Sequence, residues 1–228
     1  MKMPLALLAC LVVACGSAQA ETIIFVDERV PDPQSFLDQT APDAELLVVR
    51  HDQDGLRQIR HATEARSNLD GIHIVTHGEP GQLMLGSKTL DLAAIHQYRD
   101  QLSAIGSSLA ADGDILLYGC NLAQGRNGRA FVSALSAATQ ADIAASANPT
   151  GSSERGGDWL LEIASGPIET ASIEQSADEY PFLLYPTDLD GATGWTTLHK
   201  GAQFDPTGDT QANKAGTEIV GDSAHSTT

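Results

Sequence analysis

Short apolar runs, separated by turn residues or by helix-like segments, follow one another along the chain up to about residue 170. The runs are rich in Val, Ile and Leu and show little polar alternation. Runs of this kind are typical of strands that are buried on both faces of a sheet. We predict such strands at residues 22–27, 45–50, 72–76, 115–118, 142–145 and 159–163.

Between the predicted strands, apolar positions recur at the three- and four-residue spacing of an amphipathic helix. Asp91 is a suitable N-cap for the longest of these helices, which we expect to continue to about Ala110. Its predicted inner face comprises Leu92, Ile95, Leu102, Ile105 and Leu109. Further helices are predicted at residues 34–38, 55–67 and 128–139, and a hairpin at residues 82–90.

The alternation of strands and helices predicts an α/β fold with a mostly parallel sheet. Right-handed crossovers then bring the C-terminal ends of the parallel strands to one edge of that sheet. Ligands and reactive groups occupy this edge in open α/β sheets. Candidate functional residues are therefore expected directly after the predicted strands.

The strand-and-helix pattern ends near Thr170, so we assign residues 21–170 to one domain. Residues 171–185 are interpreted as a linker, with a hydrophobic anchor at Tyr180–Pro186. From Thr187 onward the chain is rich in Gly, Thr and Asp, which predicts the start of a second, β-rich domain within residues 171–228. The sequence stops before such a domain would be complete, and we interpret it as a truncated product or a fragment of a longer protein.

Residues 1–20 have the pattern of a secretory signal peptide. Lys2 precedes an apolar stretch at Leu5–Ala14, and Ala18–Ala20 forms an A-x-A cleavage site. An alternative is a lipoprotein signal, because Val12–Cys15 resembles a lipobox in which Cys15 would carry the lipid. Either interpretation predicts an exported protein, located in the periplasm, at the cell surface or outside the cell. No later segment is apolar for long enough to predict a membrane span.

The chain carries 13 basic and 30 acidic residues, for a formal net charge of −17. This charge disfavours binding to nucleic acids and to anionic lipids, because both would repel the protein. The acidic residues are scattered along the chain and do not form a separate acidic tail.

One of the three cysteines lies outside the predicted signal peptide. Cys10 and Cys15 lie within the predicted signal peptide, so Cys120 would be the single cysteine of the mature chain. An unpaired cysteine in an oxidising compartment indicates an intermolecular disulfide, a buried inert thiol or a reactive thiol. Composition is compatible with all three states of Cys120, and its position in the fold distinguishes them.

Cys120 and His77 end two of the predicted strands. His77 follows the apolar run at 72–76, and Cys120 follows the run at 115–118. The hairpin and long helix between them are suited to a crossover between neighbouring parallel strands, which lie about 4.8 Å apart. We therefore predict a catalytic dyad, with Cys120 as nucleophile and His77 as general base or acid. The backbone N–H groups of Gly78 and Cys120 would bind the developing oxyanion.

A metal site at His73 and His77 is the main alternative for the histidines. On a strand these two residues would be about 13 Å apart, which is too far for one ion. We therefore expect His73 to be a core histidine with its hydrogen bonds satisfied. Neither a metal nor a cofactor is expected in the protein.

Three stretches carry a family resemblance: Ile74–Leu83, Gly113–Cys120 and Gly156–Glu162. On these motifs, residues 22–170 resemble the DUF4347 family, which is found at the N-terminus of many very large bacterial surface and adhesin-like proteins. A strand ending in His-Gly followed by a strand ending in Cys is also similar to the caspase-like cysteine peptidases. This second resemblance implies a caspase-like three-layer sandwich, with His77 and Cys120 at the dyad positions.

Two functional hypotheses follow. In the first, the protein is an exported caspase-like cysteine endopeptidase that cleaves a peptide or protein substrate, including its own parent chain. In the second, it is a catalytically silent module with a peptidase-like fold, which serves as an N-terminal cap or interaction domain of a surface protein. The second hypothesis predicts that Cys120 is buried and unreactive.

Overall fold

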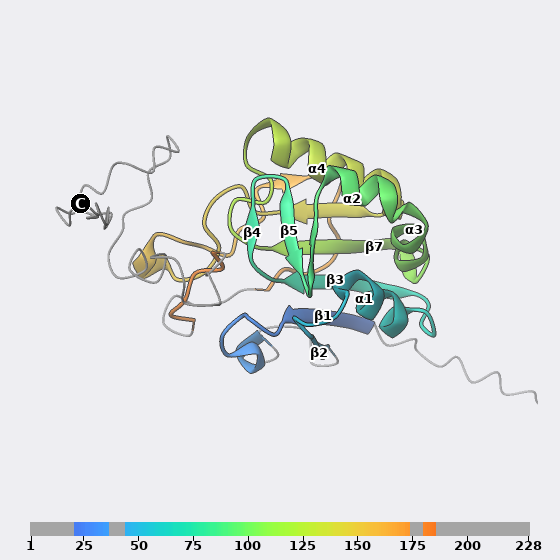
Figure 1. Cartoon of the computed structure of the whole chain (residues 1–228), viewed down its shortest axis with the longest axis horizontal. Helices are drawn as coiled ribbons and strands as arrows, with labels where there is room; N and C mark the ends of the chain where they lie inside the picture. The colour runs from blue at the N-terminus through green and yellow to red at the C-terminus, as the bar shows by residue number, and fades with distance from the viewer. Residues whose placement is uncertain (1–20, 37–43, 174–179, 186–228) are drawn as a thin grey trace, which may run out of the picture.

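A six-stranded, mostly parallel sheet forms the centre of the molecule (Figure 1). The computed structural model describes residues 21–36, 44–173 and 180–185. The strand order is β2-β1-β3-β7-β8-β9, in which only β9 runs antiparallel to its neighbour. A second sheet of three short antiparallel strands, β4-β5-β6, lies at one side of the first. The predicted α/β fold with a mostly parallel sheet is confirmed.

The strands of the large sheet are β1 (Glu21–Asp27), β2 (Glu45–Val49), β3 (Leu69–Val75), β7 (Leu109–Tyr118), β8 (Asp142–Ala145) and β9 (Ile163–Ala164). The small sheet comprises β4 (Gly78–Glu79), β5 (Gln82–Leu85) and β6 (Lys88–Leu90). The helices are α1 (Gly55–Thr63), α2 (Leu92–Gln97), α3 (Arg99–Gly106) and α4 (Gly125–Thr139), with two 3₁₀ turns, η1 (Pro33–Phe36) and η2 (Ser153–Arg155).

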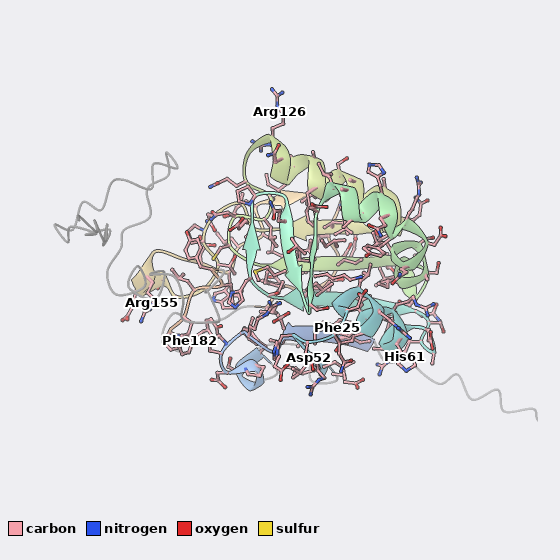
Figure 2. The ribbon with its side chains drawn as sticks, viewed as in Figure 1. Phe25, Asp52, His61, Arg126, Arg155 and Phe182 are labelled. Atoms are coloured by element: carbon pink, nitrogen blue, oxygen red, sulfur yellow. The ribbon has the colours of Figure 1, made fainter. Side chains whose placement is uncertain are left out.

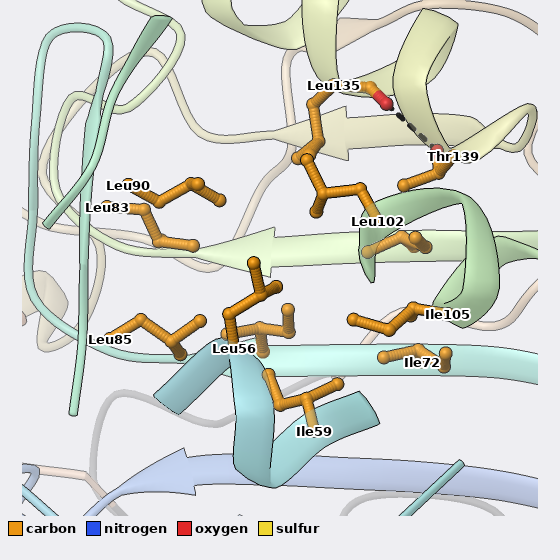
Figure 3. Close-up of a pocket in the computed structure, with 12 residues that line it drawn as sticks. Leu56, Ile59, Ile72, Leu83, Leu85, Leu90, Leu102, Ile105, Leu135 and Thr139 are labelled. Carbon is orange, nitrogen blue, oxygen red and sulfur yellow. Dashed lines mark hydrogen bonds between the residues drawn. The ribbon is translucent and has the colours of Figure 1, made fainter. Parts of the chain in front are cut away.

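The two faces of the large sheet are covered differently, which makes a three-layer arrangement. The apolar residues of α1–α4 and of the small sheet pack together on one face, which we call the helical face. Figure 3 shows part of this face, where a small cavity is lined almost wholly by aliphatic side chains, among them Leu56, Leu102 and Leu135. The opposite face is covered by η1 and by apolar residues within 159–173 and 180–185. We call it the dyad face, because Cys120 belongs to it.

The predicted helix from Asp91 to Ala110 is wrong in two respects. Asp91 does cap a helix, accepting a hydrogen bond from the backbone N–H of Ala94 at 2.8 Å, but Tyr98 leaves the helical conformation and divides the segment into α2 and α3. Leu109 pairs with Leu69 in the large sheet, so this residue begins β7. The spacing of Leu109 is compatible with both a helix and a strand, and its pairing with Leu69 places it in a strand. Leu92, expected on the inner face, is 37% exposed.

Smaller differences occur at element ends. The predicted strand at 159–163 is reduced to β9 at Ile163–Ala164. The helix predicted at 55–67 ends at Thr63, and that predicted at 34–38 begins as the 3₁₀ turn η1. The predicted signal peptide, the lipobox and the β-rich segment from Thr187 lie outside the described residues.

Packing of this domain continues beyond Thr170. Ile173, Tyr180 and Leu184 are fully buried on the dyad face, in contact with residues of the sheet. Figure 1 shows residues 180–185 at the end of the large sheet where β3 and β7 have their C-termini. In the part of the chain that the structure describes, no helix is both long and apolar enough to cross a membrane.

Candidate functional site

Two neighbouring strands bring His77 and Cys120 to the same edge of the large sheet. β3 and β7 are parallel partners, and Val75 is paired with Tyr118 at their C-terminal ends. His77 and Cys120 each lie two residues beyond this last pair, so they occupy equivalent positions. Val75, Tyr118 and Cys120 pack together on the dyad face, and the alternation of side chains along a strand predicts the same side for His77. Sheet register thus places the two predicted residues at equivalent positions just past two neighbouring strands.

The Cys120 thiol is enclosed. It is 0% exposed and forms no disulfide. The backbone N–H of Thr150 donates to Sγ at 3.3 Å, and the thiol lies 3.6 Å from the carbonyl oxygen of Thr150. Burial raises the pKa of Cys120 to about 12, although nearby backbone N–H groups oppose the rise. In this closed arrangement the residue is a neutral thiol at neutral pH.

The His77 ring is equally buried, at 1% exposure. Its Nε2 lies 3.4 Å from the carbonyl oxygen of Arg29, while Nδ1 has no hydrogen-bond partner among the described residues. A carbonyl can only accept, so the tautomer with hydrogen on Nε2 satisfies this contact and leaves a lone pair on Nδ1. Burial lowers the pKa of His77 and keeps the ring neutral, which is the state required of a general base.

A buried ion pair fixes the carbonyl that His77 contacts. Arg29 binds the Asp27 carboxylate through Nε at 2.7 Å and Nη2 at 2.9 Å. The backbone N–H of Gly86 donates to the same carboxylate at 2.9 Å, and Arg29 Nη2 donates to the Gly86 carbonyl at 2.8 Å. Burial opposes ionisation of Asp27, but these hydrogen bonds outweigh it, and the pKa of the carboxyl is lowered.

The sequence analysis missed this pair. Asp27 is the last residue of β1, which adjoins β3 in the sheet, so its position at the same edge was the available signal.

Gly78 lies against the backbone of Cys120. A Cβ atom at Gly78 would come within 2.5 Å of the Leu122 side chain and within 3.3 Å of the Cys120 carbonyl oxygen. Only glycine allows this approach without displacing Leu122. The two predicted oxyanion donors, the N–H groups of Gly78 and Cys120, therefore belong to adjoining backbone segments.

A further segment, residues 180–185, closes the site, and we call it the docked strand. The Leu184 N–H donates to the Thr150 carbonyl at 2.9 Å, and the Ser152 N–H donates to the Phe182 carbonyl at 2.8 Å. Leu183 forms an antiparallel bridge with Gly151. The docked strand was expected to be a linker with a hydrophobic anchor, and no sequence motif predicted its pairing beside Cys120.

The backbone of Leu184 reaches both members of the pair. Burial is the largest influence on both pKa values, and the Leu184 backbone opposes it at each residue. Backbone hydrogen bonding by Leu184 raises the pKa of His77 and lowers the pKa of Cys120.

His73 differs from its expected state. The ring is 0% exposed and stacks on Tyr118, with centroids 5.9 Å apart. Neither ring nitrogen has a hydrogen-bond partner among the described residues, so the expectation of a satisfied core histidine is wrong. Burial lowers the pKa of His73 to about 4. Within the described ranges, no three His, Cys, Asp or Glu residues are grouped in a way that could hold a metal ion.

Residues 23–184 match the family model described as a domain of unknown function, DUF4347. The chain belongs to the DUF4347 family. The DUF4347 match begins in β1 and ends at Leu184, so it includes both the Cys120–His77 pair and most of the docked strand. No curated protein matches this DUF4347 chain.

Proposed function

We propose that this DUF4347 protein is an exported, caspase-like cysteine endopeptidase that uses Cys120 and His77. One observation carries the proposal: a thiol and a neutral imidazole follow the ends of two paired strands, and residues 180–185 pair with the segment Thr150–Ser152 beside the thiol. A buried thiol with a structural role alone requires neither a neighbouring base nor a bound peptide. The bacterial surface location remains part of the proposal and rests on the predicted signal peptide and the family resemblance.

Each group has a role in acyl transfer. His77 removes the proton from the Cys120 thiol, and the sulfur attacks the carbonyl carbon of the substrate. The N–H groups of Gly78 and Cys120 are the proposed donors to the oxyanion. Asp27 acts as a positioning residue, because it holds Arg29, and the Arg29 carbonyl in turn holds His77.

Access to the thiol has to change during the reaction. With the docked strand in place, burial keeps the pKa of Cys120 near 12, and little thiolate exists at neutral pH. Movement of this strand would admit water and a second substrate, and both lower the cost of forming a thiolate beside His77. We therefore propose that the described state is latent towards substrates other than the segment already bound.

The test compares the full chain with its Cys120→Ala variant, each incubated with reductant, alone and with an unfolded protein such as casein. We expect peptide-bond cleavage by the wild type and none by Cys120→Ala. Cys120 is enclosed, so the small change to Ala leaves the fold intact. His73→Phe is the matched control, because it alters a buried residue of the neighbouring strand β3 that forms no hydrogen bond to the thiol. Equal cleavage by wild type and Cys120→Ala would refute the endopeptidase proposal.

Burial of Cys120 favours one second candidate, a catalytically silent interaction module. In that case the docked strand would be a permanent part of the core, and the thiol would resist modification under all native conditions. Alkylation by iodoacetamide distinguishes the candidates: no native-state labelling, with or without disruption of the docked strand, is the outcome expected of the silent module.

A further inference from the structure

A fourth strand end, after those of β1, β3 and β7, contributes to the sheet edge that carries Cys120. β8 is the parallel partner of β7 and ends at Ala145, so Ser146 follows it directly. Ser146 and Thr150 are both 0% exposed. Neither has a role in the mechanism proposed above, although both form hydrogen bonds to the Gly119–Cys120 segment.

The hydroxyl groups of these two residues form a directed chain of hydrogen bonds. Ser146 Oγ lies 3.3 Å from the Gly119 carbonyl oxygen, which can only accept, so Ser146 donates its single hydroxyl hydrogen there. Ser146 Oγ and Thr150 Oγ1 are 2.6 Å apart, and Thr150 is therefore the donor in this pair. The chain runs from Thr150 through Ser146 to the carbonyl of the residue before Cys120, and it fixes the Thr150 side chain.

The main chain of Thr150 completes a ring at the sulfur. Its N–H donates to Cys120 Sγ at 3.3 Å, and its carbonyl oxygen accepts the thiol at 3.6 Å. When the thiol gives its proton to His77, the contact with the carbonyl is lost. The contact with the N–H then becomes a hydrogen bond to a charged acceptor, which is stronger than one to a neutral acceptor. The Thr150 N–H therefore favours the thiolate, which is the attacking state.

Two further backbone hydrogen bonds brace this ring. The Asn121 N–H donates to the Asn148 carbonyl at 2.9 Å, and the Ala123 N–H donates to the Ser146 carbonyl at 2.8 Å. They join the segment that follows β7 to the segment that follows β8. Because the sulfur and its donor belong to segments bonded at several points, the donor is already in place before charge develops.

Thr150 also binds the docked strand. The Leu184 N–H donates to the Thr150 carbonyl at 2.9 Å. Nearby, Arg155 of η2 donates from Nε to the carbonyl of the residue before Phe182 at 2.7 Å, and Figure 2 shows Arg155 and Phe182 close together at the outer end of the molecule. Thr150 therefore contacts the sulfur through its N–H and the enclosing strand through its carbonyl.

We propose that Thr150 and Ser146 belong to the reactive site: the Thr150 N–H holds the Cys120 sulfur while it is a thiolate, and Ser146 is the positioning residue that fixes Thr150. This inference rests on the proposed function, because it takes Cys120 as the nucleophile. In this step the thiol proton passes to His77 and the electron pair stays on the sulfur.

The first arm of the experiment compares Thr150→Val, which has nearly the shape of threonine without its hydroxyl, with Thr150→Ser, which keeps the hydroxyl. Both are made in the full chain carrying Leu184→Asp, which disfavours docking of residues 180–185. Iodoacetamide labelling of Cys120 is followed by mass spectrometry of the peptide that contains it. Loss of one hydrogen bond lowers the thiolate fraction about fivefold, and the thiolate that remains is more nucleophilic, so labelling of Thr150→Val at neutral pH should be about threefold slower. Thr150→Ser should label near the parent rate.

The pH profile separates this role from a structural one. The rates of Thr150→Val and its parent should converge as the pH rises to about 10, where both sulfurs are thiolates. The other ionisable side chains at this edge, among them His77, Tyr180 and Tyr185, are the same in both chains and cancel in the comparison. Equal rates at neutral pH, a difference that does not narrow, or an equal loss in Thr150→Ser would overturn the assignment.

The second arm tests whether Ser146 acts through Thr150. Ser146→Ala removes the acceptor of the Thr150 hydroxyl and should slow labelling as much as Thr150→Val, with no further loss when the two are combined. Ser108→Ala is the matched control and should leave the rate unchanged. Ser108 is a buried serine just before β7, at the other end of the sheet, and its hydroxyl donates to the Ile105 carbonyl at 2.6 Å. Additive losses from Ser146→Ala and Thr150→Val would show that Ser146 is not a positioning residue for Thr150.

Failure of this proposal is distinct from failure of the endopeptidase proposal, because labelling does not require peptide-bond cleavage. If casein is cleaved but Thr150→Val labels at the parent rate, only the roles of Thr150 and Ser146 are wrong. If labelling changes as expected but casein stays intact, the roles of Thr150 and Ser146 at the sulfur stand and the endopeptidase proposal fails.

Discussion

The two faces of the large sheet contain residues of different kinds. Aliphatic side chains fill the helical face, and the cavity there has Thr139 as its one polar lining residue, whose hydroxyl donates to the Leu135 carbonyl at 2.9 Å (Figure 3). More of the buried polar atoms without a partner within the described residues lie on the dyad side: both nitrogens of His73, Nδ1 of His77, Nε1 of Trp159 and the hydroxyl of Tyr180, against Oε1 of Gln101 in α3. Unpaired buried polar groups are destabilising, so they are expected mainly where function requires them.

The difference indicates that the two faces of the sheet have different roles. The helical face stabilises the fold by burying apolar area. The dyad face holds a thiol and an imidazole in their neutral forms under a short strand that is attached mostly by main-chain bonds. Changes on the helical face should therefore affect stability, and changes on the dyad face should affect reactivity.

The largest effect is expected from displacing the docked strand. Leu184→Asp places a carboxylate in an enclosed apolar site, which disfavours docking. The pKa of Cys120 would then fall from about 12 towards its ordinary value of 9, and alkylation by iodoacetamide at neutral pH should accelerate by about 10²–10³-fold. Leu160→Asp is the control, because Leu160 is 65% exposed and should leave the rate unchanged. Slow labelling of Leu184→Asp would show that other elements enclose the thiol.

On the helical face, Phe131→Ala should cost about 4 kcal/mol in the free energy of unfolding. Phe131 is 0% exposed in the core, and removing such a ring leaves a cavity. Leu92→Ala, at a site that is 37% exposed, should cost less than about 1 kcal/mol. Chemical denaturation of both variants measures this difference, and comparable losses would contradict the description of Leu92 as peripheral.

The pH dependence of stability tests the unpartnered histidine. The pKa of His73 is about 4 in the folded protein against an ordinary value of 6.5, so the unfolded chain binds a proton that the folded chain excludes. Stability is therefore lost as pH falls from about 6.5 to about 4, by about 3 kcal/mol for this residue. Denaturation curves of wild type and His73→Phe across this range should diverge, with the variant less sensitive to acid. Parallel pH profiles would show that His73 is not held neutral.

Removal of the Asp27 charge is expected to have a smaller effect. Asp27→Asn weakens both hydrogen bonds from Arg29, which is largely buried, and should cost about 2 kcal/mol in stability. Because Arg29 positions His77, cleavage of casein should slow as well. Asp52→Asn disrupts the exposed pair with Arg50 and should change neither quantity measurably. If the Asp27 variant loses stability but cleaves at the wild-type rate, the positioning role is wrong.

The sequence analysis predicted the features that depend on local pattern. Apolar runs located the strands, and parallel topology put His77 and Cys120 at one edge, because strand ends are visible in a single sequence. The docked strand could not be predicted, since its pairing with Thr150–Ser152 joins distant backbone atoms and leaves no side-chain pattern. Leu109 was misplaced because its spacing fits a helix and a strand equally well.

The most direct test of the dyad is the effect of His77 on the reactivity of Cys120 once the docked strand is displaced. The rate of iodoacetamide labelling at Cys120 is measured for Leu184→Asp and for Leu184→Asp combined with His77→Ala, at neutral pH. A working dyad predicts a rate at least about tenfold lower in the double variant, because the imidazole no longer favours the thiolate. Equal rates in the two variants would contradict the dyad.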